Sequence, residues 1–105
     1  MPRGDIVRLS PPKSEGGVQQ GSRFGVVLQS DALAPLSTVL VAPTSQRALH
    51  THFRPAITIG SEQTKVLVEQ LTAIDVRRAS DTVGHVSVEE MWTIDDAVAL
   101  VVGIH

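Results

Sequence analysis

The stretch SVEEMWTIDDAVALVVG, residues 87–103, predicts the helix against which the rest of the fold packs. Ser87 and Glu90 form the S-x-x-E pattern of a capping box, in which each side chain accepts a hydrogen bond from the other residue's backbone N–H. Gly103 is suited to ending a helix, because glycine adopts the left-handed conformation of a C-cap without steric cost. The stretch predicts an amphipathic helix of about four turns. Its apolar residues at helical spacing are Met91, Ile94, Val98 and Val101, joined by Ala97 and Leu100.

Upstream of this helix, short runs of apolar and β-branched residues alternate with turn-forming residues. We expect strands at residues 6–9, 24–29, 38–42, 56–59 and 65–69. Residues 71–79 suit either a further strand or a helical turn. Regularly spaced short strands followed by one helix are typical of a small barrel or sandwich. The predicted fold class is therefore mainly β, or β-rich α+β, closed by the C-terminal helix.

The composition indicates a single folded domain spanning residues 1–105, because 42% of the residues are hydrophobic and 19% are charged. The absence of cysteine excludes disulfides, a thiolate nucleophile and cysteine-ligated metal sites. The first residues lack the apolar region of a signal peptide. The longest apolar run, 97–104, is too short to span a bilayer. We therefore expect a cytoplasmic protein that makes no contact with a membrane.

Net charge and aromatic content do not by themselves indicate a nucleic-acid binder. Nine basic residues stand against eleven acidic ones, which gives a net charge of −2. Phe24, Phe53 and Trp92 are too few aromatic residues to form an obvious platform for stacking bases. His50 and His52 have no convincing third metal ligand nearby, so we expect a solvated loop there and neither a metal nor another cofactor.

Polar residues stand at the ends of several predicted strands, where functional residues are often found. Arg23 precedes the 24–29 strand and offers paired donors for phosphate oxygens, although a surface arginine at a strand start is an ordinary alternative. Thr44 and Ser45 closely follow the 38–42 strand. Their hydroxyls could help to cradle an anionic oxygen, or they could satisfy a turn of their own backbone.

Glu69 is the carboxylate of greatest chemical interest. It ends the predicted 65–69 strand, where alternation places it on the same face as Leu67. A carboxylate on an apolar face has a raised pKa and is suited to acid–base chemistry. A charge that protects a sheet edge is the alternative.

Five short blocks follow one another along the chain: RGD at 3–5, QQGSR at 19–23, VAPTS at 41–45, VLVEQL at 66–71 and VGHVS at 83–87. In order and spacing they resemble the MazF/PemK/Kid toxins of bacterial toxin–antitoxin systems. The resemblance implies an SH3-like (CcdB-like) barrel with a terminal helix, acting as a homodimer. It also implies metal-independent, sequence-selective cleavage of single-stranded RNA and inhibition by a cognate antitoxin protein.

In the implied reaction the ribose 2′-OH attacks the adjacent phosphate, which leaves a 2′,3′-cyclic phosphate and a free 5′-OH. This chemistry needs a proton acceptor, a proton donor and stabilisation of the developing charge. The resemblance implies that Arg23 stabilises the charge, a hydroxyl after Pro43 holds the phosphate, and Glu69 accepts the proton. Aligned with the family pattern without a gap, Ser45 takes the position of the family's threonine, whereas a one-residue deletion places Thr44 there. The resemblance therefore leaves open which of the two hydroxyls is meant. The residues expected to contact RNA are Gln20, Ser22, Arg47 and Gln70.

The chain departs from the family pattern beside these residues, which leaves other functions open. Phe24 stands where the family usually has proline, and Pro43-Thr44-Ser45 shortens the usual Pro-x-Thr-Ser. A catalytically degenerate member and a non-enzymatic, CcdB-like poison of DNA gyrase are the alternatives. The poison needs the last residues of the helix to project from the protein, whereas we expect Trp92 and residues 98–104 to be buried.

Overall fold

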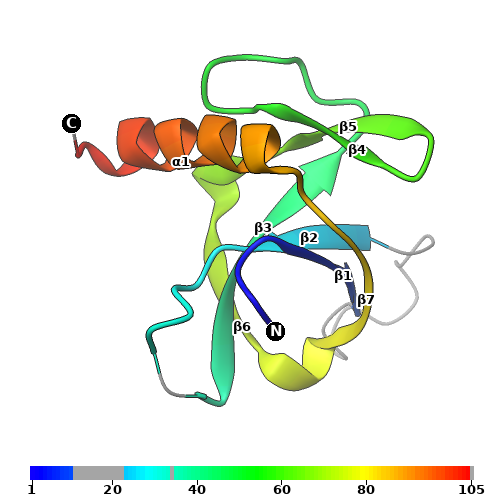
Figure 1. Cartoon of the computed structure of the whole chain (residues 1–105), viewed down its shortest axis with the longest axis vertical. Coiled ribbons are helices and arrows are strands. Elements are labelled where there is room, and N and C mark those ends of the chain that lie inside the picture. Colours follow the sequence, from blue (N-terminus) through cyan, green and yellow to red (C-terminus); the bar gives the residue numbers. More distant parts are fainter. Residues whose placement is uncertain (11–22, 34, 105) are drawn as a thin grey trace.

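Figure 1 shows the computed structural model of the chain, which describes residues 1–10, 23–33 and 35–104. A strongly curled antiparallel sheet forms the body of the protein, and one helix near the C-terminus lies across it (Figure 1). The predicted mainly β fold with a C-terminal helix is confirmed, with the sheet curled into a half-barrel. The two prolines and three glycines of residues 10–22 predict a long loop, and of these residues only Ser10 is among those that the structure describes.

Seven strands, two short 3₁₀ helices and one α-helix make up the described residues. The strands are β1 (Asp5–Leu9), β2 (Arg23–Val27), β3 (Thr38–Ser45), β4 (Ala56–Ile59), β5 (Glu62–Val66), β6 (Thr72–Asp75) and β7 (Ala79–His85). The helices are η2 (Val68–Gln70), η3 (Val76–Arg78) and α1 (Val88–Val102). The strand order in the sheet is β4-β5-β3-β2-β1-β7, and β6 also pairs with β3.

β3 is the central strand, because three other strands pair with it. β2 pairs with its second half, where Gly25 lies opposite Pro43. β6 pairs with its first half, and β5 pairs with its last two residues, Thr44 and Ser45. The chain from β5 through η2 to β6 therefore runs along one edge of β3, and β2 occupies the other edge. The start of β2, the end of β3 and β5 meet as a result.

Two apolar clusters stabilise the sheet. Successive residues of β1 enter different clusters, because neighbouring side chains of a strand point to opposite faces. Ile6 packs in the cluster that includes residues of α1, and Val7 packs in the other. Ile94 and Ala97 are the residues of α1 that are fully removed from water in the first cluster. Burial of this apolar surface is the main term that stabilises the fold.

The capping box predicted for the helix is confirmed. Ser87 Oγ accepts a hydrogen bond from the Glu90 backbone N–H at 3.0 Å, and Glu90 Oε1 accepts one from the Ser87 N–H at 2.8 Å. Gly103 ends the helix in the left-handed conformation, with φ of 81°. Within the residues that the structure describes, no helix combines the length and hydropathy needed to cross a membrane.

The sheet differs from the sequence prediction in its second half. The strand predicted at 65–69 is wrong in position, because β5 ends at Val66 and the chain then turns into η2. Both structures considered for 71–79 occur, since β6 is followed directly by η3. β7 escapes prediction because most of its residues are exposed and lack apolar alternation.

The expected burial of Trp92 and residues 98–104 is wrong for Trp92 and residues 100–104, whereas Val98 is partly buried against the first cluster. Trp92 is 63% exposed, and most of the last turn of α1 faces solvent as well. The reason is geometric, because Ile94 and Ala97 supply the buried stripe while the end of the helix projects past the sheet (Figure 1). The exposed apolar residues at the C-terminal end are Leu100, Val101, Val102 and Ile104.

Candidate active site

A cleft of about 500 Å³ opens where the start of β2, the end of β3 and β5 meet. Four of the predicted site residues line this cleft together: Arg23, Thr44, Ser45 and Arg47. The other residues that line it are Phe24, Gln46, Ile59, Glu62 and Thr64. The cleft thus combines two guanidinium groups with hydroxyl and amide groups, which is a combination suited to binding an anion.

Arg23 reaches the cleft because it is the first residue of β2, and β2 is paired on both sides. Leu9 of β1 lies opposite Arg23, and two residues further on Pro43 of β3 lies opposite Gly25. Since the strands are antiparallel, the residues that follow Pro43 run back toward Arg23. The side chain of Arg23 is exposed. Among the residues that the structure describes, it has no ion-pair partner.

Phe24, at the position where proline is usual in the resembled family, connects the cleft to the interior. Its ring is partly buried against the cluster beneath α1, and the Arg8 guanidinium lies 5.3 Å from the ring centroid. Such a cation–π contact restrains both side chains. Phe24 therefore forms an apolar wall of the cleft that is packed on both sides.

Of the two hydroxyls at the end of β3, one donates a hydrogen bond and the other accepts hydrogen bonds. Thr44 Oγ1 donates to the carbonyl oxygen of Phe24 at 3.3 Å, so its hydrogen is committed to the backbone of β2. Ser45 Oγ accepts from the backbone N–H groups of Arg47 and Ala48, at 3.3 and 3.2 Å. The turn-forming role considered for these residues is thus present at Ser45. Its own hydrogen is still available to a ligand, because those two contacts use only the oxygen lone pairs.

Glu62 is a cleft residue that sequence reasoning missed. It begins β5, and its Oε1 accepts from Gln46 Nε2 at 3.3 Å. Next to it, Lys65 Nζ donates to the carbonyl oxygen of Gln46 at 3.2 Å. The prediction placed the start of this strand at residue 65, which left Glu62 in a turn without a partner. Glu62 is the one carboxylate among the described residues that line the cleft.

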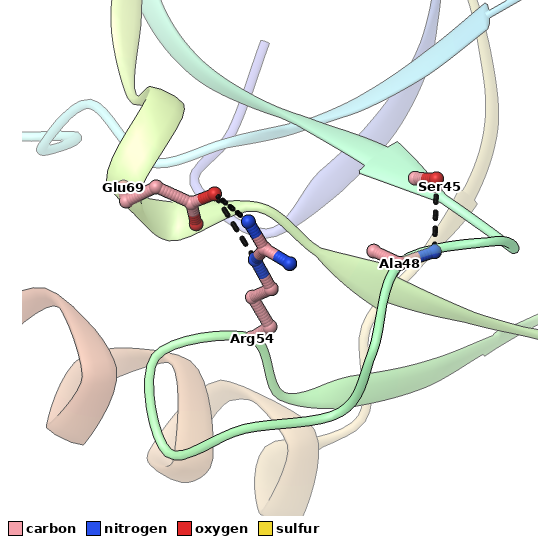
Figure 2. Close-up of polar contacts among 4 residues, drawn as sticks. All are labelled: Ser45, Ala48, Arg54 and Glu69. Atoms are coloured by element: carbon pink, nitrogen blue, oxygen red, sulfur yellow. Dashed lines mark hydrogen bonds and ion pairs between the residues drawn. The ribbon is translucent and has the colours of Figure 1, made fainter.

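Glu69 does not line the cleft, and it is bound to another side chain (Figure 2). Its Oε2 accepts from Arg54 Nε at 3.0 Å and from Arg54 Nη2 at 2.7 Å. The hydrogen bonds from this guanidinium hold the pKa of Glu69 below its ordinary value of 4.5, although partial burial acts in the other direction. The raised pKa predicted for Glu69 is therefore wrong, because the nearest strong influence is a cation and not an apolar face.

The remaining predicted site residues are not brought into the cleft by the described structure. Gln70 ends η2 with an exposed side chain and does not line the cleft. Gln20 and Ser22 lie outside the described residues. His50 and His52 are exposed on the loop between β3 and β4. Within the described ranges, no three side chains of histidine, cysteine, aspartate or glutamate gather closely enough to hold a metal ion.

The described residues combine a curled β-sheet, a C-terminal helix and a cleft lined by two arginines and two hydroxyl groups. The model of the PemK-like, MazF-like toxins of type II toxin–antitoxin systems matches residues 2–102. A candidate toxin of Mycobacterium tuberculosis is 31% identical in an alignment 104 residues long that covers 97% of each chain. The chain belongs to the PemK/MazF-like toxin family.

Solved structures share the fold over the whole chain. An endoribonuclease from a mycobacterial species, solved with its cognate antitoxin, has a TM-score of 0.82 at 16% identity and covers 100% of this chain and 97% of its own. The MazE–MazF complex of Deinococcus radiodurans (Form II) has a TM-score of 0.79 at 16% identity, with 100% and 97% covered. Toxin MazF-mt6 of M. tuberculosis has a TM-score of 0.78 at 14% identity, with 96% and 98% covered.

Proposed function

We propose that this protein is a metal-independent, sequence-selective endoribonuclease toxin that cleaves single-stranded RNA. The observation that carries the proposal is the cleft shared by Arg23, Arg47 and the hydroxyls of Thr44 and Ser45. The toxin family and the likeness to solved endoribonucleases support it. A phosphate backbone fits this cleft, because guanidinium groups bind phosphate oxygens in pairs.

In the proposed reaction the 2′-OH of one ribose attacks the adjacent phosphorus, and the bond to the next 5′-oxygen breaks. The products end in a 2′,3′-cyclic phosphate and a free 5′-OH. Arg23 stabilises the negative charge that accumulates on the phosphate oxygens, because its guanidinium stays charged and offers paired donors. Arg47 binds the RNA backbone beside this phosphate. Gln20, Ser22 and Gln70 are proposed to contact RNA further along the path.

We assign the phosphate-holding hydroxyl to Ser45. A phosphate oxygen needs a hydrogen-bond donor, and Ser45 has its hydrogen available while Thr44 donates its own to Phe24. Accepting two backbone N–H groups also polarises the Ser45 hydroxyl, which makes it a stronger donor. Thr44 then acts by holding the ends of β2 and β3 together.

The family resemblance and the cleft point to different residues as the proton acceptor. Glu69, the candidate from the family resemblance, is neutralised by Arg54 and does not line the cleft. Glu62 is a carboxylate that does line it. We therefore propose Glu62 as the proton acceptor, and Glu62→Gln should lower kcat far more than Glu69→Gln. The reverse order would return the role to Glu69.

We propose further that the protein acts as a homodimer and is neutralised by a cognate antitoxin. The solved MazE–MazF complex and the mycobacterial endoribonuclease–antitoxin complex support a protein partner of this kind. A segment that combines acidic and apolar residues would complement the arginines and the Phe24 wall of the cleft. Competition between such a segment and RNA for Arg23 would then explain the inhibition.

The experiment that tests the proposed function is incubation of the purified protein with a long single-stranded RNA in EDTA. We expect discrete fragments that carry 5′-OH ends. An Arg23→Ala protein should leave the same RNA intact. Cleavage that stops when EDTA is added would contradict the metal-independent mechanism, and intact RNA with the wild-type protein would contradict nuclease activity altogether.

One observation favours a second candidate function, a non-enzymatic poison of DNA gyrase. The apolar end of α1 projects from the fold with Leu100, Val102 and Ile104 exposed, as that function requires. A gyrase poison would trap cleaved DNA in a supercoiling reaction without acting on RNA. A truncation before Leu100 should abolish such trapping, whereas RNA cleavage should depend on Arg23.

A further inference from the structure

We infer that Arg54 and Glu69 form a positioning ion pair, which holds the loop of residues 46–55 so that Gln46 and Arg47 stay at the cleft. The inference rests on the proposed function, because it concerns how that cleft binds RNA. It replaces the chemical role considered for Glu69 by a structural one that acts through Arg47. Figure 2 shows the contacts that fasten the loop at its two ends.

The C-terminal end of the loop is fastened to η2. Both Arg54 contacts end on the same carboxylate oxygen of Glu69, and the two side chains are only 28% and 27% exposed. The backbone N–H of Arg54 donates to the carbonyl oxygen of Thr51 at 3.0 Å. The Arg54 guanidinium also lies 5.4 Å from the centroid of the Phe53 ring. Arg54 is thus held by its backbone, by an aromatic face and by a carboxylate.

The N-terminal end of the loop is fastened to β3 and β5. Ser45 Oγ accepts from two successive backbone N–H groups, those of Arg47 and Ala48. Lys65 of β5 donates to the carbonyl oxygen of Gln46 at 3.2 Å. Gln46 is bound through its side chain as well, to Glu62. The residues that line the cleft are therefore those nearest to a fastened end.

Between the two ends, three residues of the loop face solvent. Leu49 is 76% exposed, and His50 and His52 are exposed too. Without the Arg54–Glu69 pair, the exposed middle of the loop would be restrained mainly by the Ser45 contacts at its N-terminal end. The Arg47 side chain would then be less restrained, and RNA binding would have to restrict it at a cost in affinity. The Arg54–Glu69 pair reduces this cost before RNA arrives.

The chemistry of the pair also argues against direct catalysis by Glu69. Two hydrogen bonds from one guanidinium stabilise the charged form of the Glu69 carboxylate, so the carboxylate takes up a proton less readily. Its lowered pKa makes it a weaker base than an ordinary glutamate. The Arg54–Glu69 pair joins the loop to η2, so it can hold the loop in position instead.

A charge-exchange experiment separates these roles. Glu69→Gln and Arg54→Gln should each raise KM for a short RNA by about fivefold, the size of effect that one partly exposed ion pair supports, with kcat nearly unchanged. The double exchange Arg54→Glu with Glu69→Arg should restore much of the wild-type KM. Asp81→Asn serves as the matched control, because it removes the exposed Arg8–Asp81 pair between β1 and β7, away from the loop.

If Glu69 were instead the proton acceptor, kcat would collapse in Glu69→Gln and the double exchange would restore nothing. That pattern would overturn the inference. So would single variants whose KM equals that of Asp81→Asn.

Trypsin cleavage after Arg47 supplies a readout that does not depend on RNA. Arg47 is exposed, and the bond after Arg54 is protected by Pro55, so cleavage after Arg47 reports on the loop. We expect the Glu69→Gln protein to be cut there several-fold faster than the wild type and the Asp81→Asn protein. Equal rates would overturn the inference even if RNA is cleaved. A wild-type protein that resists trypsin but leaves RNA intact would refute the proposed function. The inference that the Arg54–Glu69 pair holds the loop would still stand.

Discussion

Glu90 Oε2 accepts a hydrogen bond from the backbone N–H of Thr58 at 2.9 Å, which ties the first turn of α1 to β4. The other oxygen of the same carboxylate accepts from the backbone N–H of Ser87 and completes the capping box. One side chain thus starts the helix and sets its position on the sheet. The edge strand β4 also gains a partner for a backbone N–H that would otherwise face water.

We predict that Glu90→Ala lowers the free energy of unfolding by about 1–2 kcal/mol, because two backbone N–H groups lose their acceptor. Glu90→Gln should cost less, since an amide retains one acceptor oxygen. Urea denaturation of both variants checks this order. Glu89→Ala is the control, as Glu89 lies in the same turn and takes no part in the capping box. Equal loss in Glu89→Ala and Glu90→Ala would mean that only the charge near the helix start matters.

For Arg23→Ala, we predict a loss of RNA cleavage of about 100-fold or more, the effect of removing one donor to a developing anion. Thermal stability should change little, because the side chain is exposed and exposed substitutions usually shift stability by less than about 0.5 kcal/mol. Arg23→Lys should recover part of the activity, since it restores the charge but not the paired donors. A large drop in melting temperature would move Arg23 into a structural role.

We predict that removing the Ser45 hydroxyl and removing the Thr44 hydroxyl have different effects on RNA cleavage. Ser45→Ala should greatly reduce cleavage, whereas Thr44→Val should keep most of it and lose some stability through the missing contact with Phe24. Because Ser45→Ala also releases two backbone N–H groups, Ser45→Thr is needed as a variant that keeps the hydroxyl. Activity in Ser45→Thr with none in Ser45→Ala would assign the effect to the hydroxyl. The opposite ranking of Thr44→Val and Ser45→Ala would assign the phosphate to Thr44.

The Arg54–Glu69 pair predicts a specific dependence on pH. Since the pKa of Glu69 in the folded protein lies below its ordinary value of 4.5, the pair contributes stability above that value. This contribution is lost as the pH falls through the lowered pKa. An NMR titration of the Glu69 carboxyl should have a midpoint below 4.5, and Arg54→Gln should raise it. A wild-type midpoint at or above 4.5 would show that the pair does not form in solution.

Sequence reasoning succeeded where the structural signal is local. The capping box and Gly103 determine the ends of α1 through contacts within a few residues, so they could be predicted directly. The burial of the last helical turn could not, because helical spacing says which residues share a face but not where the sheet beneath them ends. β7 lacked a local signal for a similar reason, since it is specified by its pairing with β1.

For the candidate site, the family resemblance singled out Arg23, Thr44 and Ser45, and the strand pairing brings them to one cleft. Glu62 could not be found, because its place depends on where β5 begins. The state of Glu69 depends on Arg54, which is fifteen residues away and reaches it only after the loop has folded back. A carboxylate's pKa follows from its neighbours in space, which a strand pattern does not specify.

The pairing of the first strand with the last has a consequence for synthesis of the chain. β1 is joined to β7, so Asp5 cannot meet its partner His85 until most of the protein has been translated. The core beneath α1 then waits for Ile94 and Ala97 as well. Contacts so distant in sequence slow folding, and a growing chain on the ribosome must carry an open sheet until these residues have been made. A partner made at the same time therefore has the whole period of translation in which to arrive before the protein acquires its finished form.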